Sequence, residues 1–298
     1  MRLEEACDVD LNDGDADLTH EELTARLRGK QGAITVLTNI VNRDLLESAP
    51  DLKVVANIAV GYNNIDVRAA REQGVVVTNT PDVLTEASAD LTWALILGIT
   101  RRIVEGDRLI RAGKWNGWAL DFMLGTELGG KQLGIVGMGR IGRAVAARAP
   151  AFGMRVACMS RLSQSIAGAE VMALDRLLAT SDIVSLHCPL TPETRHLIDQ
   201  AALARMKRSA YLINTSRGPV VDEAALAWAL KNRIISGAAL DVFEEEPKVH
   251  PDLLSLENVV LVPHLGSATT ETRTAMAVLA VRNVIAVLSG KPPLTPVG

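Results

Sequence analysis

The stretch that decides the fold is QLGIVGMGRIGRAVAARA, residues 132–149, where a short apolar run leads into three glycines. In a strand–turn–helix unit with G-x-G-x-x-G spacing, the first glycine allows a tight turn and the second lets the backbone approach a pyrophosphate. The third lets the helix pack closely on the strand. The first turn of the helix then offers unpaired N–H groups to the anion. A tight turn without a ligand is the alternative. We predict a dinucleotide-binding loop made of Gly137, Met138, Gly139, Arg140, Ile141 and Gly142.

Short apolar runs alternate with helical patterns along the chain. Those before residue 80 cover 33–37, 53–60 and 75–77, and longer runs recur from residue 132 to 264. Near-continuous apolar strands separated by helices are typical of a parallel sheet covered on both faces. We therefore predict an α/β fold. Residues 81–113 are expected to form a long helical connector, and residues 268–290 a final helix that returns to the first domain.

Composition excludes several classes of protein. The 298 residues carry a net charge of −4, and no basic face for nucleic acid or polybasic run for a membrane is evident. The most apolar run, residues 91–99, is far shorter than the ~20 residues of a membrane span. The three cysteines are scattered along the chain, so we interpret them as reduced thiols and not as a disulfide framework or a metal site. No signal peptide is recognised at the first residues, so we expect a soluble cytoplasmic protein.

The second strand of the predicted βαβ unit ends in VACMSRLSQ, residues 156–164. An acid that grips the ribose 2′-hydroxyl usually stands here, but this stretch has none. Arg161, flanked by Ser160 and Ser163, suits a 2′-phosphate, which no carboxylate would repel. The stretch predicts NADP as cofactor. The alternative is a solvated arginine, with NAD bound without an acidic clamp.

Polar residues follow three later strands. Ligands of doubly wound sheets bind outside the carboxyl ends of the strands, so Arg217, the acids 241–246 and His264 should face one crevice. A histidine paired with a carboxylate can act as an acid or base, and an arginine can hold a carboxylate with two hydrogen bonds. Beside a nicotinamide, this set indicates hydride transfer to a 2-keto acid. His20, His187, His196 and His250 are interpreted as structural. We also assign Cys188, Pro189, Thr215 and Ser216 to the cofactor site.

Five motifs in order resemble the D-isomer-specific 2-hydroxyacid dehydrogenase family over nearly the whole chain: residues 133–146, 187–198, 212–226, 238–247 and 258–269. Residues 60–67, 79–97 and 113–128 are most similar to its glyoxylate/hydroxypyruvate reductases. The resemblance implies a flavodoxin-like substrate domain (1–78 and 268–298) with a Rossmann domain (79–267) inserted in it. It further implies an active site between the domains and a homodimer joined by the Rossmann domain and the connector.

The resemblance also implies roles for individual residues. Arg217 matches the substrate-binding arginine, His264 the catalytic histidine, and Glu246 its carboxylate partner. Asp241 matches the acid that contacts the nicotinamide amide, and Val60 and Gly61 match the loop whose N–H groups hold the substrate carboxylate. Trp118 matches an aromatic residue that reaches the active site of the neighbouring subunit, with interface packing as the alternative for Trp115 and Trp118. Ser267, three residues past His264, is placed near the substrate by its position.

The chain departs from the family pattern at its beginning. Family members usually open with a strand and a helix, whereas residues 1–12 resemble the end of that first helix. We therefore expect the substrate domain to lack its first strand, or the true start to lie upstream.

Several functions stay open. Glyoxylate and hydroxypyruvate are both candidate substrates. A phosphoglycerate dehydrogenase and formate or phosphite oxidation are alternatives on the same scaffold. A dinucleotide-sensing module like the corepressors of this fold is disfavoured by the complete Arg217, Glu246 and His264 set.

Overall fold

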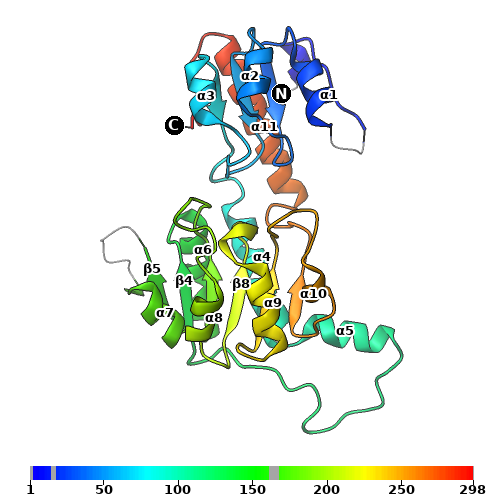
Figure 1. Ribbon diagram of the computed structural model, residues 1–298, viewed down its shortest axis with the longest axis vertical. Coiled ribbons are helices and arrows are strands. Elements are labelled where there is room, and N and C mark those ends of the chain that lie inside the picture. The colour runs from blue at the N-terminus through cyan, green and yellow to red at the C-terminus, as the bar shows by residue number, and fades with distance from the viewer. Residues whose placement is uncertain (1–2, 15–17, 161–167, 298) are drawn as a thin grey trace. The chain divides into compact units, whose positions relative to one another are not determined.

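A computed structural model describes residues 3–14, 18–160 and 168–297. The chain divides into two compact units (Figure 1): a small unit of the residues up to Leu84 and from Thr269 onward, and a large unit, Thr85–Ala268. The sequence placed the first boundary earlier, after residue 78. The difference arises because Asn79 and Thr80 hydrogen-bond within the small unit, through their N–H groups to Thr295 O (3.2 Å) and Ala59 O (2.8 Å).

The large unit is built on a seven-stranded sheet in the order β10-β9-β8-β7-β4-β5-β6. Every adjacent pair is parallel. The strands are β4 (Gln132–Val136), β5 (Arg155–Met159), β6 (Ala169–Val171), β7 (Ile183–Leu186), β8 (Tyr211–Asn214), β9 (Gly237–Leu240) and β10 (Val259–Leu261). The strand order reverses between β4 and β7, which is the point where doubly wound sheets bind ligands. The predicted α/β class is confirmed.

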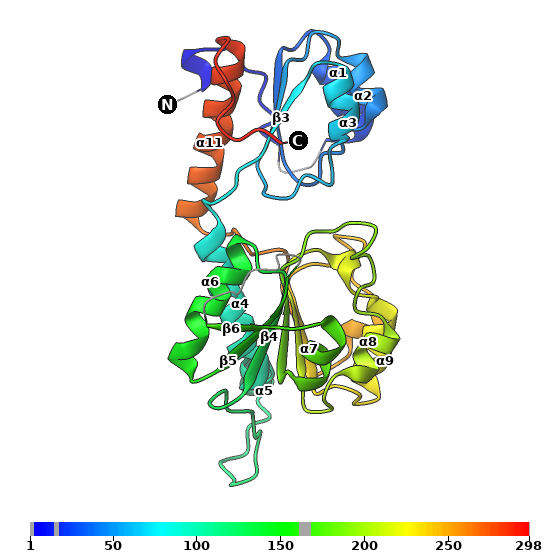
Figure 2. The same cartoon turned by 90° about the vertical axis from the view of Figure 1, so that its left-hand side faces the viewer.

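Helices cover both faces of this sheet (Figure 2). One face packs against α4 (Thr85–Thr100), α6 (Arg140–Arg148) and the 3₁₀ turn η2 (Ala149–Phe152), with Trp93 stacked on Phe152 at 4.3 Å between ring centroids. The other face packs against α7 (Leu174–Thr180), α8 (Gln200–Arg205), α9 (Glu223–Lys231) and α10 (Pro251–Leu254); the 3₁₀ turn η3 (Gly218–Val220) precedes α9. Strands β4, β7 and β9 are fully buried, and β8 is buried except at its half-buried first residue, which explains the continuous apolar runs in the sequence.

The predicted connector is not one helix. It contains α4 and then α5 (Ile103–Arg111), separated at Arg102, whose φ of 55° is left-handed. The carbonyl of Thr100 accepts a hydrogen bond from Thr126 N (2.8 Å), a partner that lies outside the helix. The prediction of one continuous helix was therefore wrong, because a tertiary contact takes a carbonyl at the end of α4. Residues 112–125 then form a long loop that leaves the body of the large unit (Figure 1).

The small unit has a parallel three-stranded sheet, β1 (Gly32–Thr35), β2 (Val54–Asn57) and β3 (Val76–Thr78), in that order. One face packs against α1 (His20–Leu27), α2 (Arg43–Ser48) and α3 (Val67–Glu72). The other packs against α11 (Thr270–Leu288), near which lies the 3₁₀ turn η1 (Leu3–Glu5). The predicted return of the final helix to the first domain is thus seen in the core of the small unit.

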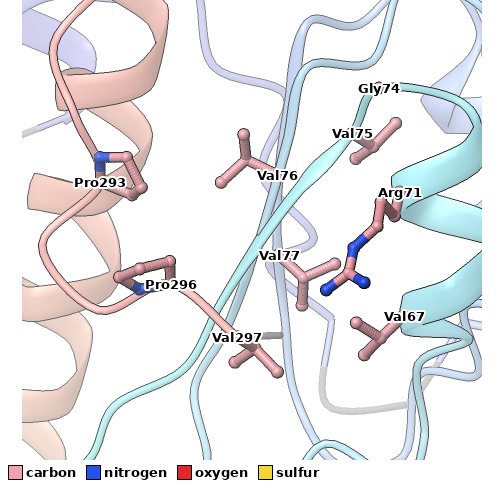
Figure 3. Close-up of a pocket in the computed structure, with 9 residues that line it drawn as sticks. All are labelled: Val67, Arg71, Gly74, Val75, Val76, Val77, Pro293, Pro296 and Val297. Atoms are coloured by element: carbon pink, nitrogen blue, oxygen red, sulfur yellow. The ribbon is translucent and has the colours of Figure 1, made fainter.

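A surface pocket lies beside β3, where residues 293–297 approach the strand (Figure 3). Valines and prolines line it, with Arg71 the charged side chain among them. None of the lining residues belongs to the set that the sequence predicts for catalysis or cofactor binding, and we assign it no role.

Candidate active site

The glycine loop lies between β4 and α6, as predicted. Gly137 has a φ of 101°, and a Cβ on Gly142 would stand 2.1 Å from Gly137 O, so neither position tolerates a side chain. By contrast, a Cβ on Gly139, the N-cap of α6, would meet nothing within 4 Å. The loop therefore leaves open space in front of the first turn of a nine-residue helix. A pyrophosphate fits this arrangement, because the helix N-terminus presents unpaired N–H groups and a positive dipole end.

Neighbouring strand ends converge on the same loop. Gly137 N donates to Met159 O (3.1 Å) at the end of β5, which brings Ser160 next to the glycine loop. A Cβ on Gly137 would stand 2.6 Å from Cys188 N, so the loop after β7, with Cys188 and Pro189, packs directly on it. Arg161 and Ser163 lie outside the described residues.

Within the glycine loop, the three intervening residues differ in exposure. Met138 is buried (4% exposed) in the hydrophobic core, Arg140 is exposed, and Ile141 is half-buried.

The loop after β8 is fixed by an asparagine that the sequence analysis did not single out. The Asn214 side chain is buried; its Oδ1 accepts from Ser216 N (3.1 Å) and Ser216 Oγ (2.9 Å), and its Nδ2 donates to Arg217 O (3.0 Å). Thr215 lies between, with its hydroxyl 3.1 Å from that of Thr92 on α4. Asn214 therefore sets the backbone course that delivers Arg217. A buried asparagine at a strand end is the only signal the sequence held for it.

Asp241, at the end of β9, holds the loop after β10. Its carboxylate accepts hydrogen bonds from the N–H groups of Leu265 and Gly266, and its carbonyl accepts from His264 N (2.9 Å). Burial raises the pKa of the Asp241 carboxyl, against the opposing effect of these backbone hydrogen bonds. Asp241 is 1% exposed, so its carboxylate positions the histidine loop from inside the protein. Ser267, the next residue of that loop, is half-buried.

His264 and Glu246 form the pair that the sequence suggested. Nδ1 of His264 lies 2.8 Å from Glu246 Oε2, and the other carboxylate oxygen accepts from Phe243 N (3.0 Å). Burial acts to raise the pKa of Glu246, but the hydrogen bond from His264, that from Phe243 N, and the charges of His264 and Arg217 together hold it below its usual value. His264 has a left-handed φ of 52°, and such conformations gather at functional sites. Because Nδ1 faces the carboxylate, Nε2 is the ring nitrogen left for a reactant.

Arg217 belongs to the same cluster. Its charge acts on Glu246, and burial lowers the pKa of its guanidinium. The next residue shows why the two loops are close: a Cβ on Gly218 would stand 1.8 Å from Phe243 O. The structure thus brings Arg217, Asp241, Glu246 and His264 together at the carboxyl ends of three adjacent strands.

A second histidine–carboxylate pair, His196 and Glu244, involves the same loop that carries Glu246. Nε2 of His196 lies 2.6 Å from Glu244 Oε1, while Glu244 Oε2 accepts from Glu223 N (3.1 Å). Glu223 in return accepts from the N–H groups of Glu244 and His250 (2.5 and 3.2 Å). His196 was predicted to be structural, and here it helps to tie the loop carrying Glu246 to the start of α9. The sequence could not reveal the pair, because 48 positions separate its members.

Comparison with known proteins agrees with this geometry. The profile described as "D-isomer specific 2-hydroxyacid dehydrogenase, NAD binding domain" matches residues 93–266. The chain belongs to this family. It is 50% identical over 279 residues to a glyoxylate reductase of Thermococcus litoralis, covering 91% of this chain and 84% of that protein.

Solved structures give the same result. A protein from Thermus thermophilus is 46% identical with a TM-score of 0.91, over 95% of this chain and 91% of that one. An NADPH-dependent glyoxylate/hydroxypyruvate reductase from Sinorhizobium meliloti, solved with NADP and malonate, is 38% identical with a TM-score of 0.85, over 92% of this chain and 86% of that one. The predicted family and Rossmann fold are confirmed. This member of the family is an oxidoreductase that acts on the CH–OH group and uses a nicotinamide dinucleotide.

Two further groups of predicted residues belong to other segments of the chain than the loops at the strand ends of the large unit. Val60 and Gly61 follow β2 in the small unit. Trp115 and Trp118 stand on the loop after α5, 55% and 81% exposed. Their roles stay predictions. In the part of the chain that the structure describes, no helix is long and apolar enough to cross a membrane.

Proposed function

We propose that this dehydrogenase reduces glyoxylate or hydroxypyruvate to the D-2-hydroxy acid, with NADPH as the preferred reductant. The observation that carries the proposal is the His264–Glu246 pair beside Arg217, on the sheet edge that also bears the glycine loop. The names of the relatives support the substrate class, since they include glyoxylate reductases and a glyoxylate/hydroxypyruvate reductase.

His264 is the proposed general acid. Glu246 binds Nδ1 at 2.8 Å and stabilises the positively charged ring, so Nε2 donates a proton to the carbonyl oxygen of the substrate. The bound dinucleotide supplies the hydride for the new C–H bond. The side chain of His264 keeps 31% of its surface exposed, which leaves the imidazole accessible to a reactant.

Arg217 is the proposed substrate-binding residue. Its guanidinium carries a charge and several donors, so it can orient the carboxylate of a keto acid and polarise the carbonyl. Asn214 holds the Arg217 carbonyl and Asp241 holds the histidine loop, so both reacting side chains stand on backbone that is hydrogen-bonded in advance.

The preference for NADPH rests on the end of β5. Ser160 directly follows Met159, whose carbonyl is bonded to the glycine loop, so the ribose 2′-substituent of a bound dinucleotide lies near this strand end. A serine hydroxyl followed in sequence by an arginine favours a phosphate there over a free hydroxyl.

We also propose a cytoplasmic homodimer that uses α5 and the loop 112–125. This segment exposes large apolar side chains: Ile103, Ile110, Trp115, Trp118, Leu120, Phe122 and Leu124. Large apolar side chains exposed together on one segment are a feature of interaction sites.

One experiment tests the activity. Purified enzyme is assayed for NADPH and NADH oxidation with glyoxylate, hydroxypyruvate, pyruvate and phosphohydroxypyruvate, and the size of the particle is measured by light scattering. We expect the highest kcat/KM with glyoxylate or hydroxypyruvate and NADPH. Preference for phosphohydroxypyruvate would favour the phosphoglycerate dehydrogenase alternative, and absence of turnover with every pair would refute the proposal.

A further inference from the structure

The loop after β2 in the small unit has its carbonyl groups held from within the protein. Asn79 Nδ2 donates to Val60 O (2.8 Å), and Asn57 Nδ2 donates to Gly61 O (3.1 Å). Thr80 N donates to the preceding carbonyl, Ala59 O (2.8 Å). Three consecutive peptide groups are therefore fixed by donors from two segments of the chain.

This fixes the N–H groups as well. In a trans peptide the N–H points opposite to the carbonyl of the preceding residue. The N–H groups of Val60, Gly61 and Tyr62 must then point away from the donors that hold the carbonyls before them. Within the described residues, none of these three N–H groups donates to a protein acceptor. Unpaired N–H groups in a rigid loop form an anion-binding feature.

The asparagine that fixes Gly61 is itself locked. Asn57 is 0% exposed; its Oδ1 accepts from Thr35 Oγ1 (3.1 Å), and its Nδ2 also reaches Asn64 Oδ1 (3.1 Å). Asn64 in turn donates to Val36 O (3.2 Å) and Asn39 O (2.9 Å). Burying amide groups costs free energy of folding unless each group has a hydrogen-bond partner. In this network the last acceptor is the carbonyl of Gly61.

We infer that Asn57 and Asn79 are positioning residues that orient the loop 60–62 for a carboxylate, and that Tyr62 N–H is a donor to it beside Val60 and Gly61. This inference deepens the proposed function and rests on it for the identity of the anion, the carboxylate of a small 2-keto acid. The asparagines do not touch the substrate. They act by keeping three peptide groups from rotating.

The kinetic test uses Asn79→Asp, which keeps the size of the side chain but places an acceptor against Val60 O. Because the loop would bind the carboxylate before and during the reaction alike, KM for the keto acid should rise about tenfold to a hundredfold while kcat changes little. KM for NADPH should stay as in the wild type. The matched control is Asn42→Ala, which removes the N-cap of α2 in the same unit, where the Asn42 side chain accepts a hydrogen bond from Leu45 N (3.0 Å).

A second readout does not depend on turnover. The chain has two tyrosines, so ¹⁵N-tyrosine labelling gives backbone signals from Tyr62 and Tyr211 alone. Tyr211 N is bonded to Asp182 O (3.0 Å) in the large unit and serves as the internal reference. Titration with oxamate, an unreactive keto-acid analogue, should move the Tyr62 signal and leave that of Tyr211 in place, and Asn79→Asp should weaken the response.

The outcomes separate the two proposals. An unchanged keto-acid KM in Asn79→Asp, an equal rise in Asn42→Ala, or a Tyr62 signal that ignores oxamate would each overturn this inference. If wild-type enzyme turns over no keto acid but Tyr62 responds to oxamate, the proposed reaction fails while the assignment of the loop stands.

Discussion

Two glycines of the same loop should respond in opposite ways to the same substitution. At Gly139 the φ of −72° suits any residue, and an added Cβ meets nothing within 4 Å. Alanine at a helix N-cap is less favourable than glycine by about 0.5–1 kcal/mol. The lower entropy of the unfolded chain offsets about 0.4–1 kcal/mol of that. Gly139→Ala should therefore fold with a Tm within about 3 °C of the wild type.

The effect of Gly139→Ala should fall on the cofactor instead. The methyl group would occupy the open space in front of α6, where the pyrophosphate approaches the backbone. Losing or lengthening one hydrogen bond to a charged group costs about 1.5–3 kcal/mol, which is roughly a tenfold to hundredfold weaker binding of NADPH. Gly142→Ala is the matched comparison: its Cβ would stand 2.1 Å from Gly137 O, so the backbone must shift. Overpacking of about 1–3 kcal/mol should lower Tm by several degrees.

The assay combines thermal unfolding without cofactor and fluorescence titration with NADPH for both variants. Two results would contradict this prediction: Gly139→Ala binding NADPH as tightly as the wild type, or Gly139→Ala losing as much stability as Gly142→Ala. Either result would mean that the space at Gly139 is not where the pyrophosphate lies.

Three further predictions concern the catalytic pair, the cofactor and the response to acid. His264→Ala should lower kcat by about 10²–10⁴, and Glu246→Gln should lower it less; steady-state kinetics with glyoxylate tests both, and near-normal turnover of His264→Ala would refute the assignment. NADPH should be preferred over NADH by on the order of 10–100-fold in kcat/KM, and Ser160→Asp with Arg161→Ala should reverse this; equal use of both cofactors by the wild type at low salt would contradict it. Burial lowers the pKa of His187 from 6.5 to about 4, so the contribution of this histidine to folding stability is complete above about pH 6.5 and is lost as the pH drops toward 4, by up to ~3 kcal/mol. Urea unfolding at pH 7 and 4.5 should show a smaller loss in His187→Gln, and an equal loss would remove His187 as the cause.

The sequence determined the elements whose information is local. Apolar runs marked the strands, and the spacing of Gly137, Gly139 and Gly142 fixed the βα turn, because steric limits on the turn act over a few residues. The α/β class, the family and the type of reaction followed from such stretches in order. The positions of Arg217, Asp241 and His264 could be inferred because parallel strands end at one edge of the sheet.

Tertiary structure decided what depends on partners far apart in the chain. The connector breaks at Arg102, just after Thr100 O at the end of α4 accepts a hydrogen bond from Thr126 N in a later loop. Pairings such as His196 with Glu244, 48 positions apart, and Asn79 with Val60, 19 apart, have no local signature. A hydrogen bond acts over about 3 Å in space, whatever the separation in sequence. The residues proposed for the chemistry could therefore be predicted from the chain, whereas those that hold them in place emerged only from the fold.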